Sequence, residues 1–287
     1  MQKETIEYYL EAVNRAIEFI ESNTSKNIGL EEIAEYSLLS KYHFHRVFKS
    51  IIGGTAKEYL TRLRVEKSAS LLKNSQKAIS DIAYQCGYAS PETFNRAFKN
   101  YFSVSPSTFR ENAKREIASK KIIHQETSFE SINLSQPKIV ELPDLNLAYI
   151  RHFGSYDKVG KSFQRLMLWA AKNLVLKLKP TTVGIVHDNP DLTEEVNVRF
   201  DACIVTTKEI QPKGEIGYKQ IKGGRFAVFR HKGPYESFYP VYDYIYNICL
   251  FEQRWELRDE PALEWYVKSP PFFKPESFVT DFYLPII

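Results

Sequence analysis

Cysteine, methionine, tryptophan and long apolar runs are all scarce in this sequence. Its 287 residues include only 3 cysteines, 2 methionines and 3 tryptophans. Cys86, Cys203 and Cys249 are odd in number and far apart, without C-x-x-C spacing, which argues against a disulfide framework or a zinc site and favours reduced structural thiols. No apolar stretch approaches the roughly 18 residues of a membrane span, and the polar N-terminus is unlike a secretory signal. We therefore expect a cytoplasmic protein with no membrane partner.

Motifs of common catalytic and cofactor sites are also missing. The sequence contains no G-x-x-x-x-G-K-[ST], G-x-G-x-x-G, H-E-x-x-H or G-x-S-x-G. His152 and His231 occupy equivalent positions in two copies of one turn, which favours a structural hydrogen bond over metal ligation. We expect no cofactor, no metal and no catalytic residue. The formal net charge of +4 is modest, so nucleic-acid binding would depend on where Lys and Arg are placed.

Length and patterning indicate two domains. Hydrophobic residues make up 43% and charged residues 26% of the 287, values typical of a globular protein of two average domains. Apolar residues recur with helical spacing through residues 1–112, whereas short β-rich runs separated by Gly and Pro begin near Ile139. We predict a helical domain over 1–112, a polar linker over 113–137 and an α+β domain over 138–287.

The helical half repeats itself. Ser40–Lys49 returns as Ser90–Lys99, with Ser, Phe, Arg, Phe and Lys recurring at an offset of 50. Each copy is typical of a short helix, a tight turn and a second helix that a serine can cap, and Gly87 can supply the bend. The pattern predicts a duplicated helix-turn-helix. Four phenylalanines spaced four apart are expected in its core: Phe44, Phe48, Phe94 and Phe98.

The outer face of each second helix carries side chains suited to DNA. Arg46 and Arg96 are the best candidates for reading bases, because arginine pairs bidentately with guanine, and Lys49 and Lys99 can hold phosphates. One exposed arginine is ordinarily a solvated surface residue, but the repeated placement favours a DNA role. A helix over Thr55–Asn74, about 30 Å long, could present the two copies to successive major grooves about 34 Å apart. The predicted DNA-binding residues are Tyr42, His45, Arg46, Lys49, Glu92, Thr93, Asn95, Arg96 and Lys99.

These motifs resemble the DNA-binding domain of the AraC/XylS family of bacterial transcription regulators. The matching features include Ile33-Ala34, Gly54-Thr55, Ile82-Ala83, Gly87-Tyr88 and Ser105-Pro106, besides the two repeated segments. The resemblance implies recognition helices at about 41–51 and 91–101 joined by a linker helix. By motif position, bases would be met by Tyr42, His45, Arg46, Glu92, Thr93 and Arg96. Pro91 and Glu92 depart from the amides common in relatives, so Glu92 either contacts cytosine N4 or stabilises the helix start.

The C-terminal half is duplicated as well. Ala148–Tyr156 reappears as Ala227–Tyr235 at an offset of 79, and Pro190 and Asp201 correspond to Pro270 and Asp281 at an offset of 80. Each copy is typical of a strand, a turn, a helix and further strands. Two such α+β units side by side would leave a groove along their pseudo-twofold seam, a common place for ligands.

One carboxylate stands out in this half. Glu264 lies among apolar residues on a predicted strand, where the first copy has Gly184, and its burial would be costly without a partner. A cationic ligand held over aromatic faces would supply one; alternatively, Glu264 faces water on an edge strand. The aromatic residues nearby line either a pocket or a packed core, and because Trp265 and Tyr266 alternate across the strand, at most one shares the face of Glu264. The predicted ligand-binding residues are Glu264, Trp265, Tyr266, Tyr239 and Tyr242.

The C-terminal half resembles the GyrI-like effector-binding domain. The resemblance rests on the duplicated Arg-His-x-Gly-x-Tyr turns, on Glu264-Trp-Tyr266 and on the closing Asp281–Pro285 segment. It implies that Glu264 lies in a ligand pocket. The fold class expected is an all-α double helix-turn-helix domain followed by a duplicated α+β GyrI-like domain. We expect a transcription activator whose partners are double-stranded DNA, RNA polymerase and a lipophilic or cationic small molecule. Two alternatives remain open: a hydrolase with Glu264 as general base, and a domain that binds protein partners.

Overall fold

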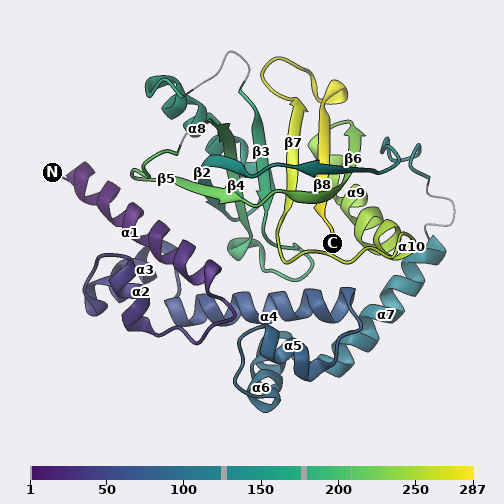
Figure 1. Ribbon diagram of the computed structural model, residues 1–287, viewed down its shortest axis with the longest axis horizontal. Coiled ribbons are helices and arrows are strands. Elements are labelled where there is room, and N and C mark those ends of the chain that lie inside the picture. The colour runs from purple at the N-terminus through teal and green to yellow at the C-terminus, as the bar shows by residue number, and fades with distance from the viewer. Residues whose placement is uncertain (1, 124–127, 176–179, 208) are drawn as a thin grey trace. The chain divides into compact units, whose positions relative to one another are not determined.

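The computed structural model describes residues 2–123, 128–175, 180–207 and 209–287. The chain divides into two compact units, Met1–Glu116 with Pro212–Glu215, and Ile117–Gln211 with Ile216–Ile287. The first is built from helices and the second around a sheet (Figure 1). The predicted fold class, a helical helix-turn-helix region followed by a sheet-rich domain, is confirmed. None of the described helices is both long enough and apolar enough to cross a membrane.

The helical unit contains two helix-turn-helix pairs. Its helices are α1 (Gln2–Ser22), α2 (Leu30–Tyr36), α3 (Lys41–Ile52), α4 (Ala56–Asn74), α5 (Ile79–Gln85), α6 (Pro91–Phe102) and the first part of α7 (Pro106–Ile123), which continues into the second unit. The first pair is α2 with α3, the second is α5 with α6, and α4 joins them (Figure 1). The duplication predicted from the offset of 50 is therefore present.

The two tight turns are built differently. Gly87 has a φ of 81°, and a Cβ at this position would lie 2.8 Å from the carbonyl oxygen of Thr24, so only glycine fits there. The first copy has Leu38 at the matching place, with a φ of 62°. The Ser90 hydroxyl caps α6 by accepting a backbone hydrogen bond, whereas the Ser40 side chain makes no capping bond to α3. The serine-cap prediction is thus right for the second copy and wrong for the first.

The helix α4 is continuous, as predicted, and begins at a capping box. The backbone N–H of Thr55 donates to the Glu58 carboxylate at 2.7 Å, and the Thr55 hydroxyl accepts the Glu58 N–H at 3.2 Å. Its 19 residues correspond to about 28 Å of helix. Ten of these residues are buried, because helices of both pairs pack around α4. The four phenylalanines of α3 and α6 are 0% exposed, so their predicted core role is confirmed.

The second unit is an eight-stranded antiparallel sheet with helices on one face. Its elements are β1 (Lys138–Leu142), β2 (Leu145–Phe153), α8 (Gly160–Lys172), β3 (Thr182–Val186), β4 (Arg199–Thr206), β5 (Ile216–Ile221), β6 (Gly224–Lys232), α9 (Phe238–Tyr244), α10 (Leu250–Glu252), β7 (Ala262–Lys268) and β8 (Val279–Pro285). A π-helical turn, Ile245–Cys249, joins α9 to α10.

The strand order shows the internal duplication directly. The order is β1-β6-β8-β7-β3-β4-β2-β5, which reads as two copies of four strands related by a twofold axis between β7 and β3. The first strand of each copy pairs with the second strand of the other copy, β1 with β6 and β5 with β2. The two copies therefore exchange their outer strands and are held in one sheet.

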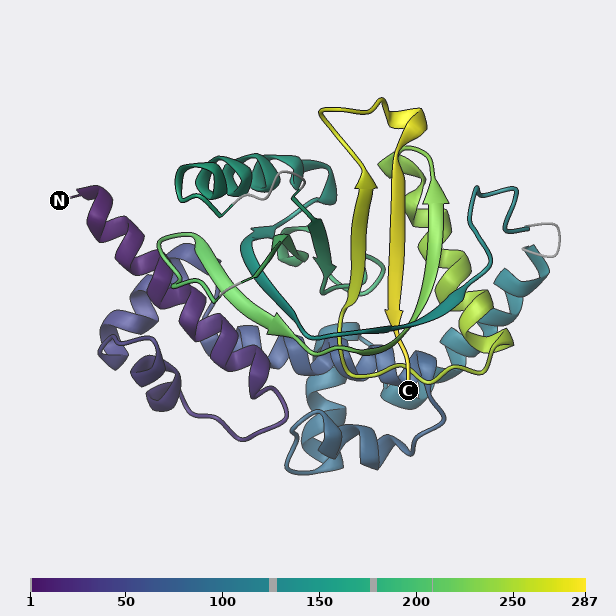
Figure 2. The ribbon, with the colours of Figure 1, turned by 45° about the horizontal axis from the view of Figure 1, so that its top comes forward.

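The two faces of the sheet have different cores. One face packs on α8, through residues such as Ala148 and Leu166, and on α9, through residues such as Val241 and Phe282. On the other face, side chains from all eight strands form one apolar cluster. A cluster that unites both edges with the centre requires a curled sheet, and Figure 2 shows the outer strands bent relative to β7 and β8. All three cysteines are buried, and none forms a disulfide bond with another described residue, as expected of structural thiols.

Candidate functional sites

The outer faces of α3 and α6 carry the predicted DNA-binding residues. Tyr42 is 84% exposed, and His45 is half-buried. The remaining predicted residues are all exposed: Arg46, Lys49, Glu92, Thr93, Asn95, Arg96 and Lys99. No described residue forms a hydrogen bond or ion pair with Arg46 or Arg96. Both guanidinium groups are thus available to an external partner.

Glu92 is engaged at the start of its own helix. Hydrogen bonds from its own backbone N–H and from the Ser90 hydroxyl lower the pKa of the Glu92 carboxyl. These bonds keep the carboxylate ionised at the positive end of the helix dipole. The geometry favours a role in stabilising the helix start over a contact with cytosine.

Polar contacts on α4 fix the helix-turn-helix pairs to it. Arg62 and Glu66 form a buried ion pair at 3.3 Å, and the Tyr101 hydroxyl of α6 donates to the Glu66 carboxylate at 2.6 Å. On the other side, the Tyr59 ring packs edge-on against Phe48 of α3 with ring centroids 5.9 Å apart. The two recognition helices are therefore held to one rigid element, which sets their spacing.

In the sheet unit, Glu264 is buried between two tyrosine hydroxyls. Its side chain lies on β7 and is 5% exposed. Tyr242 of α9 donates to one carboxylate oxygen at 2.8 Å, and Tyr266, two residues along β7, donates to the other. Because β7 pairs with β3 on one side and β8 on the other, the edge-strand alternative is wrong.

The carboxylate lies at the seam between the two copies. Glu264 is paired with Gly184 across β3 and β7, and these residues are also each other's equivalents at the offset of 80. The pseudo-twofold axis therefore passes between them. A Cβ at Gly184 would lie 2.9 Å from the Tyr266 hydroxyl oxygen and 2.3 Å from Cζ of Phe200, so the glycine leaves room for the groups that surround Glu264.

Burial dominates the electrostatics of this site. It raises the pKa of the Glu264 carboxyl, while the hydrogen bonds from Tyr266 and Tyr242 act in the opposite direction. Burial and then the Glu264 charge raise the pKa of both hydroxyls well above the ordinary tyrosine value, which keeps them protonated as donors. Among the described residues, no cationic side chain contributes to the Glu264 pKa. The Glu264 carboxyl group is therefore buried with two hydroxyl donors as its hydrogen-bond partners.

Aromatic rings enclose the carboxylate on several sides. Tyr266 is in edge contact with Phe163 of α8 at 5.4 Å and lies 5.7 Å from Tyr235, and Tyr242 is in edge contact with Phe282 at 4.9 Å. Next to Tyr266 across β7 and β8, Thr280 has a buried hydroxyl without a hydrogen-bond partner among the described residues. A ligand bound near Tyr266 could form a hydrogen bond with this hydroxyl.

The structure separates the five predicted ligand-binding residues. Glu264, Tyr242 and Tyr266 come together, whereas Trp265 points to the opposite face of the sheet and packs against Tyr283 at 5.5 Å. Tyr239 is 56% exposed, and its hydroxyl donates to Asp191. Phe163 and Tyr235, whose rings contact Tyr266, were not predicted for this site, although Tyr235 ends the second of the duplicated Arg-His-x-Gly-x-Tyr turns.

A second buried polar cluster lies on the other face, where no ligand site was predicted. Asp201 is 0% exposed. Its carboxylate accepts two hydrogen bonds from Arg151, at 2.7 and 2.9 Å, one from Lys219 at 2.6 Å and one from His187 at 2.8 Å. Burial alone would raise the pKa of Asp201, but the adjacent cations outweigh this and hold it well below the ordinary value. Burial also lowers the pKa of His187. The second copy has the equivalent pair, Arg230 with Asp281.

The two duplicated histidines make the structural hydrogen bonds that were predicted. His152 Nε2 bonds the Ser155 carbonyl at 2.9 Å, and His231 Nε2 bonds the Ser237 hydroxyl at 2.6 Å. Within the described ranges, no three His, Cys, Asp or Glu side chains are grouped so that they could hold a metal ion.

Comparison with known proteins gives a match for each unit. The GyrI-like small molecule binding domain matches residues 135–287, and a helix-turn-helix domain matches residues 33–112. The chain is similar to the probable transcription factor PqrA of Proteus vulgaris, with 37% identity over 35% of this chain and 84% of that protein. It is also similar to the lactose operon transcription activator of Staphylococcus xylosus, with 35% identity over 35% of this chain.

The lengths of these matches differ. The chain spans only 36% of the lactose operon activator. Among solved structures, the chain is similar to EcmrR in its complex with DNA. The match covers 90% of this chain and 98% of the EcmrR chain, with 14% identity and a TM-score of 0.49. Taken with the geometry of both units, the family matches lead to one assignment. The chain belongs to the AraC-type helix-turn-helix family through its N-terminal domain and to the GyrI-like small-molecule-binding family through its C-terminal domain.

Proposed function

We propose that this protein is a one-component transcription regulator, and specifically an activator, that binds DNA through residues 1–112 and a small molecule through residues 138–287. Residues 113–137 would connect the two functions. The observation that carries the proposal is the pairing, in one chain, of two exposed arginine-bearing recognition helices with a buried carboxylate that has no cationic partner among the described residues. RNA polymerase is the partner through which activation would act.

The DNA-binding half of the proposal rests on geometry within the helical unit. Arg46 and Arg96 would read guanines, and Lys49 and Lys99 would hold phosphates, because these side chains are exposed on matching faces of α3 and α6. The helix α4, about 28 Å long, is close to the roughly 34 Å between successive major grooves on one side of a duplex. One chain would then contact two adjacent groove segments.

The ligand-binding half rests on Glu264. A carboxylate buried with hydroxyl donors alone keeps much of its desolvation cost, and a bound cation would offset that cost directly. Rings of Tyr266, Tyr242 and Phe163 would face the cation, since a desolvated cation over an aromatic face gains roughly 2 kcal/mol. We therefore expect the effector to be a lipophilic organic cation. Glu264 is assigned to binding and not to catalysis, because the same chain carries a DNA-binding unit and one bound ligand is enough to shift an equilibrium.

Ligand control of transcription requires unequal affinity for two states of the protein. A cation that contacts Glu264 would compete with the hydroxyls of Tyr242 and Tyr266, each of which donates to one carboxylate oxygen, and would reorient at least one of them. The ligand-bound and ligand-free sites therefore differ in the positions of β7 and α9 side chains. This local difference supplies the unequal affinity that a population shift needs.

The test uses the full chain with DNA selected from a random pool and tetraphenylphosphonium as the cationic probe. We expect Glu264→Gln to weaken probe binding at least tenfold, about 1.4 kcal/mol, and to abolish any effect of the probe on DNA binding or transcription. Glu276→Gln, at an exposed carboxylate of the same unit, is the matched control and should change neither. Equal affinity of the two variants for the probe would refute the role of Glu264.

Other outcomes would favour the alternatives. Turnover of an ester or epoxide that disappears in Glu264→Gln would support a hydrolase with Glu264 as general base. Failure of every small molecule tried to raise the melting temperature would support a domain that binds protein partners.

A further inference from the structure

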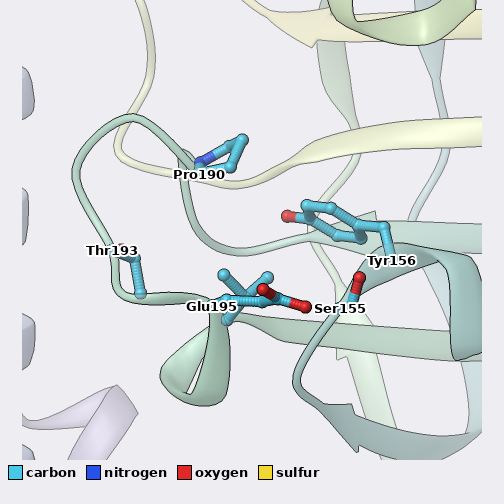
Figure 3. A pocket seen from close by; sticks show the side chains of 6 residues that line it. Ser155, Tyr156, Pro190, Thr193 and Glu195 are labelled. Atoms are coloured by element: carbon cyan, nitrogen blue, oxygen red, sulfur yellow. The ribbon is translucent and has the colours of Figure 1, made fainter.

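A hollow in the first copy of the sheet unit has features of a binding site separate from Glu264. Its volume is about 350 Å³, within the range of small-molecule sites. It is lined by Ser155, Tyr156, Pro190, Thr193, Glu195 and Val198. Figure 3 shows Pro190 and Tyr156 on one side of this hollow and Thr193, Glu195 and Ser155 on the other.

One polar group at the hollow is buried and has no partner. Thr193 is 4% exposed, and its hydroxyl makes no hydrogen bond to any described residue. A buried hydroxyl without a partner has lost its bonds to water and gained none in return, so native structures seldom keep one without a use. The Tyr156 hydroxyl, in contrast, is already donated to the Asp188 carbonyl at 2.8 Å, which leaves the Tyr156 ring as its contribution to the lining.

The wall of the hollow is rigid. Asp188 accepts two bonds from the Arg199 guanidinium, at 2.8 and 2.6 Å, and a third from the Arg199 backbone N–H at 2.7 Å. Both residues are buried. This bidentate pair closes the loop that carries Pro190, Thr193 and Glu195, so the lining is held in place before any ligand arrives.

The second copy shows that the hollow is not a necessary consequence of the fold. The backbone bond from Gly154 N–H to the Val198 carbonyl recurs from Gly233 to Phe278, which identifies Val198 and Phe278 as equivalents. In the second copy the Phe278 ring stacks on Tyr235 with centroids 4.8 Å apart. The smaller Val198 side chain does not reach over the Tyr156 ring in the way that Phe278 covers Tyr235, so this space stays empty in the first copy. The cavity therefore arises from a difference between the two copies.

The charge of the lining indicates the ligand class. Glu195 contributes an exposed carboxylate, and the lining residues in the described part of the chain include no Lys, Arg or His. Apolar contacts come from Pro190, Val198 and the ring of Tyr156. A small organic cation with an N–H donor fits these groups: the N–H can bond the Thr193 hydroxyl, the charge can face Glu195, and the apolar body can lie against the Tyr156 ring.

We propose that this hollow is a second binding site, for small primary or secondary ammonium compounds, whose lining does not include Glu264. The site needs no movement of Tyr242 or Tyr266, because none of its lining residues belongs to α9 or β7. The proposal does not depend on the regulatory function and can fail or succeed separately from it.

The experiment titrates the full chain carrying Glu264→Gln, so that the buried carboxylate cannot bind the probe, with benzylammonium and with neutral benzyl alcohol. We expect benzylammonium to bind about threefold more tightly, the effect of a partly screened charge pair, and to shift the methyl NMR signals of Thr193 and Val198. Glu195→Gln should remove this threefold preference. Glu194→Gln, at the adjacent exposed carboxylate outside the lining, is the matched control and should preserve it.

Filling the hollow is the decisive variant. Val198→Phe copies the residue of the second copy and should reduce binding of both probes at least tenfold, with the unit still folded by tryptophan fluorescence. If that variant does not fold, Thr193→Val, which removes the unpartnered hydroxyl at nearly constant volume, should still weaken benzylammonium. Unchanged binding in Val198→Phe, or equal affinity for the charged and neutral probes, would overturn the proposal. Binding that is present with Glu264 but absent in Glu264→Gln would assign the probe to the buried carboxylate instead.

Discussion

Adding a single methyl group at Gly184 would test how the seam between the two copies supports Glu264. In Gly184→Ala, the new Cβ would lie 2.3 Å from Cζ of Phe200 and 2.9 Å from the Tyr266 hydroxyl oxygen. Both distances are shorter than non-bonded contacts allow, so both rings must move. Overpacking of this kind costs about 1–3 kcal/mol. Losing the hydrogen bond from Tyr266 to a charged carboxylate adds about 1.5–3 kcal/mol.

The sheet unit can be followed on its own, because all three tryptophans, Trp169, Trp255 and Trp265, belong to it. Urea unfolding monitored by tryptophan fluorescence should show Gly184→Ala to be less stable than the wild type by about 2.5–6 kcal/mol, the sum of these two contributions. Gly217→Ala is the matched control, since its Cβ would lie 2.3 Å from Cζ of Tyr149, on the face of the sheet away from Glu264. The free energy of unfolding of Gly217→Ala should fall only by the cost of overpacking, about 1–3 kcal/mol.

Ligand binding separates the two glycine variants. The hydrogen bond from Tyr266 lowers the Glu264 pKa, so its loss in Gly184→Ala raises that pKa further and leaves less carboxylate at neutral pH. Affinity for tetraphenylphosphonium should fall in Gly184→Ala, and the deficit should shrink as the pH rises and Glu264 ionises. Gly217→Ala should bind the probe as the wild type does. A free energy of unfolding of Gly184→Ala within about 0.5 kcal/mol of the wild type, or an equal loss of affinity in both variants, would show that Gly184 does not support the Glu264 site.

Three further predictions concern the helical unit and the buried polar cluster. Arg46→Ala and Arg96→Ala should each weaken specific DNA binding by about 1–3 kcal/mol in fluorescence anisotropy, and an equal loss on random DNA would leave only a phosphate role. Tyr101→Phe should destabilise the helical unit by about 1.5–3 kcal/mol, measured by circular dichroism, because it removes the hydroxyl that bonds the buried Glu66 carboxylate. The folded-state pKa of His187 lies below its unfolded value of 6.5, so the folded state resists protonation and the wild type should lose stability as the pH falls below about 6.5. His187→Gln keeps a donor at this position and should flatten that loss between pH 7.5 and 5.5, whereas an equally steep loss in both proteins would contradict the assignment.

Much of the fold could be predicted because both halves are duplicated. An offset of 50 locates the two helix-turn-helix pairs, and phenylalanines four residues apart define the buried face of α3 and α6. These signals are local, since they depend on helical periodicity and on turn residues within one segment. The first turn was harder to read: Leu38 adopts the left-handed conformation that glycine supplies in the second copy, and nothing in its side chain indicates that.

The candidate ligand site was only partly predictable for a physical reason. The burial of Glu264 depends on β7 lying between β3 and β8, and that pairing is decided by contacts distant in sequence. The side-chain period of two does place Tyr266 on the face of Glu264 and Trp265 on the other. The α9 residue that bonds Glu264 could not be predicted in this way. Tyr239 and Tyr242 both lie near the start of α9, and the sequence alone does not show which side of this helix packs on the sheet. The helix packs Tyr242 inward and leaves Tyr239 exposed.

Both proposed ligand sites of the sheet unit arise where the two copies differ. At the axis, exact repetition would set two glutamates directly opposite each other, and two buried carboxylates so close could not both remain ionised. Glycine at 184 removes that repulsion and gives the Tyr266 hydroxyl the space to reach Glu264. Away from the axis, Val198 in place of a phenylalanine opens the hollow beside Tyr156. Duplication thus supplies a stable sheet. In a fully symmetric sheet, the hollow beside Tyr156 would be filled and the carboxylate at the axis would face a second one. Ligand binding at either place therefore depends on the substitutions that make the two copies differ.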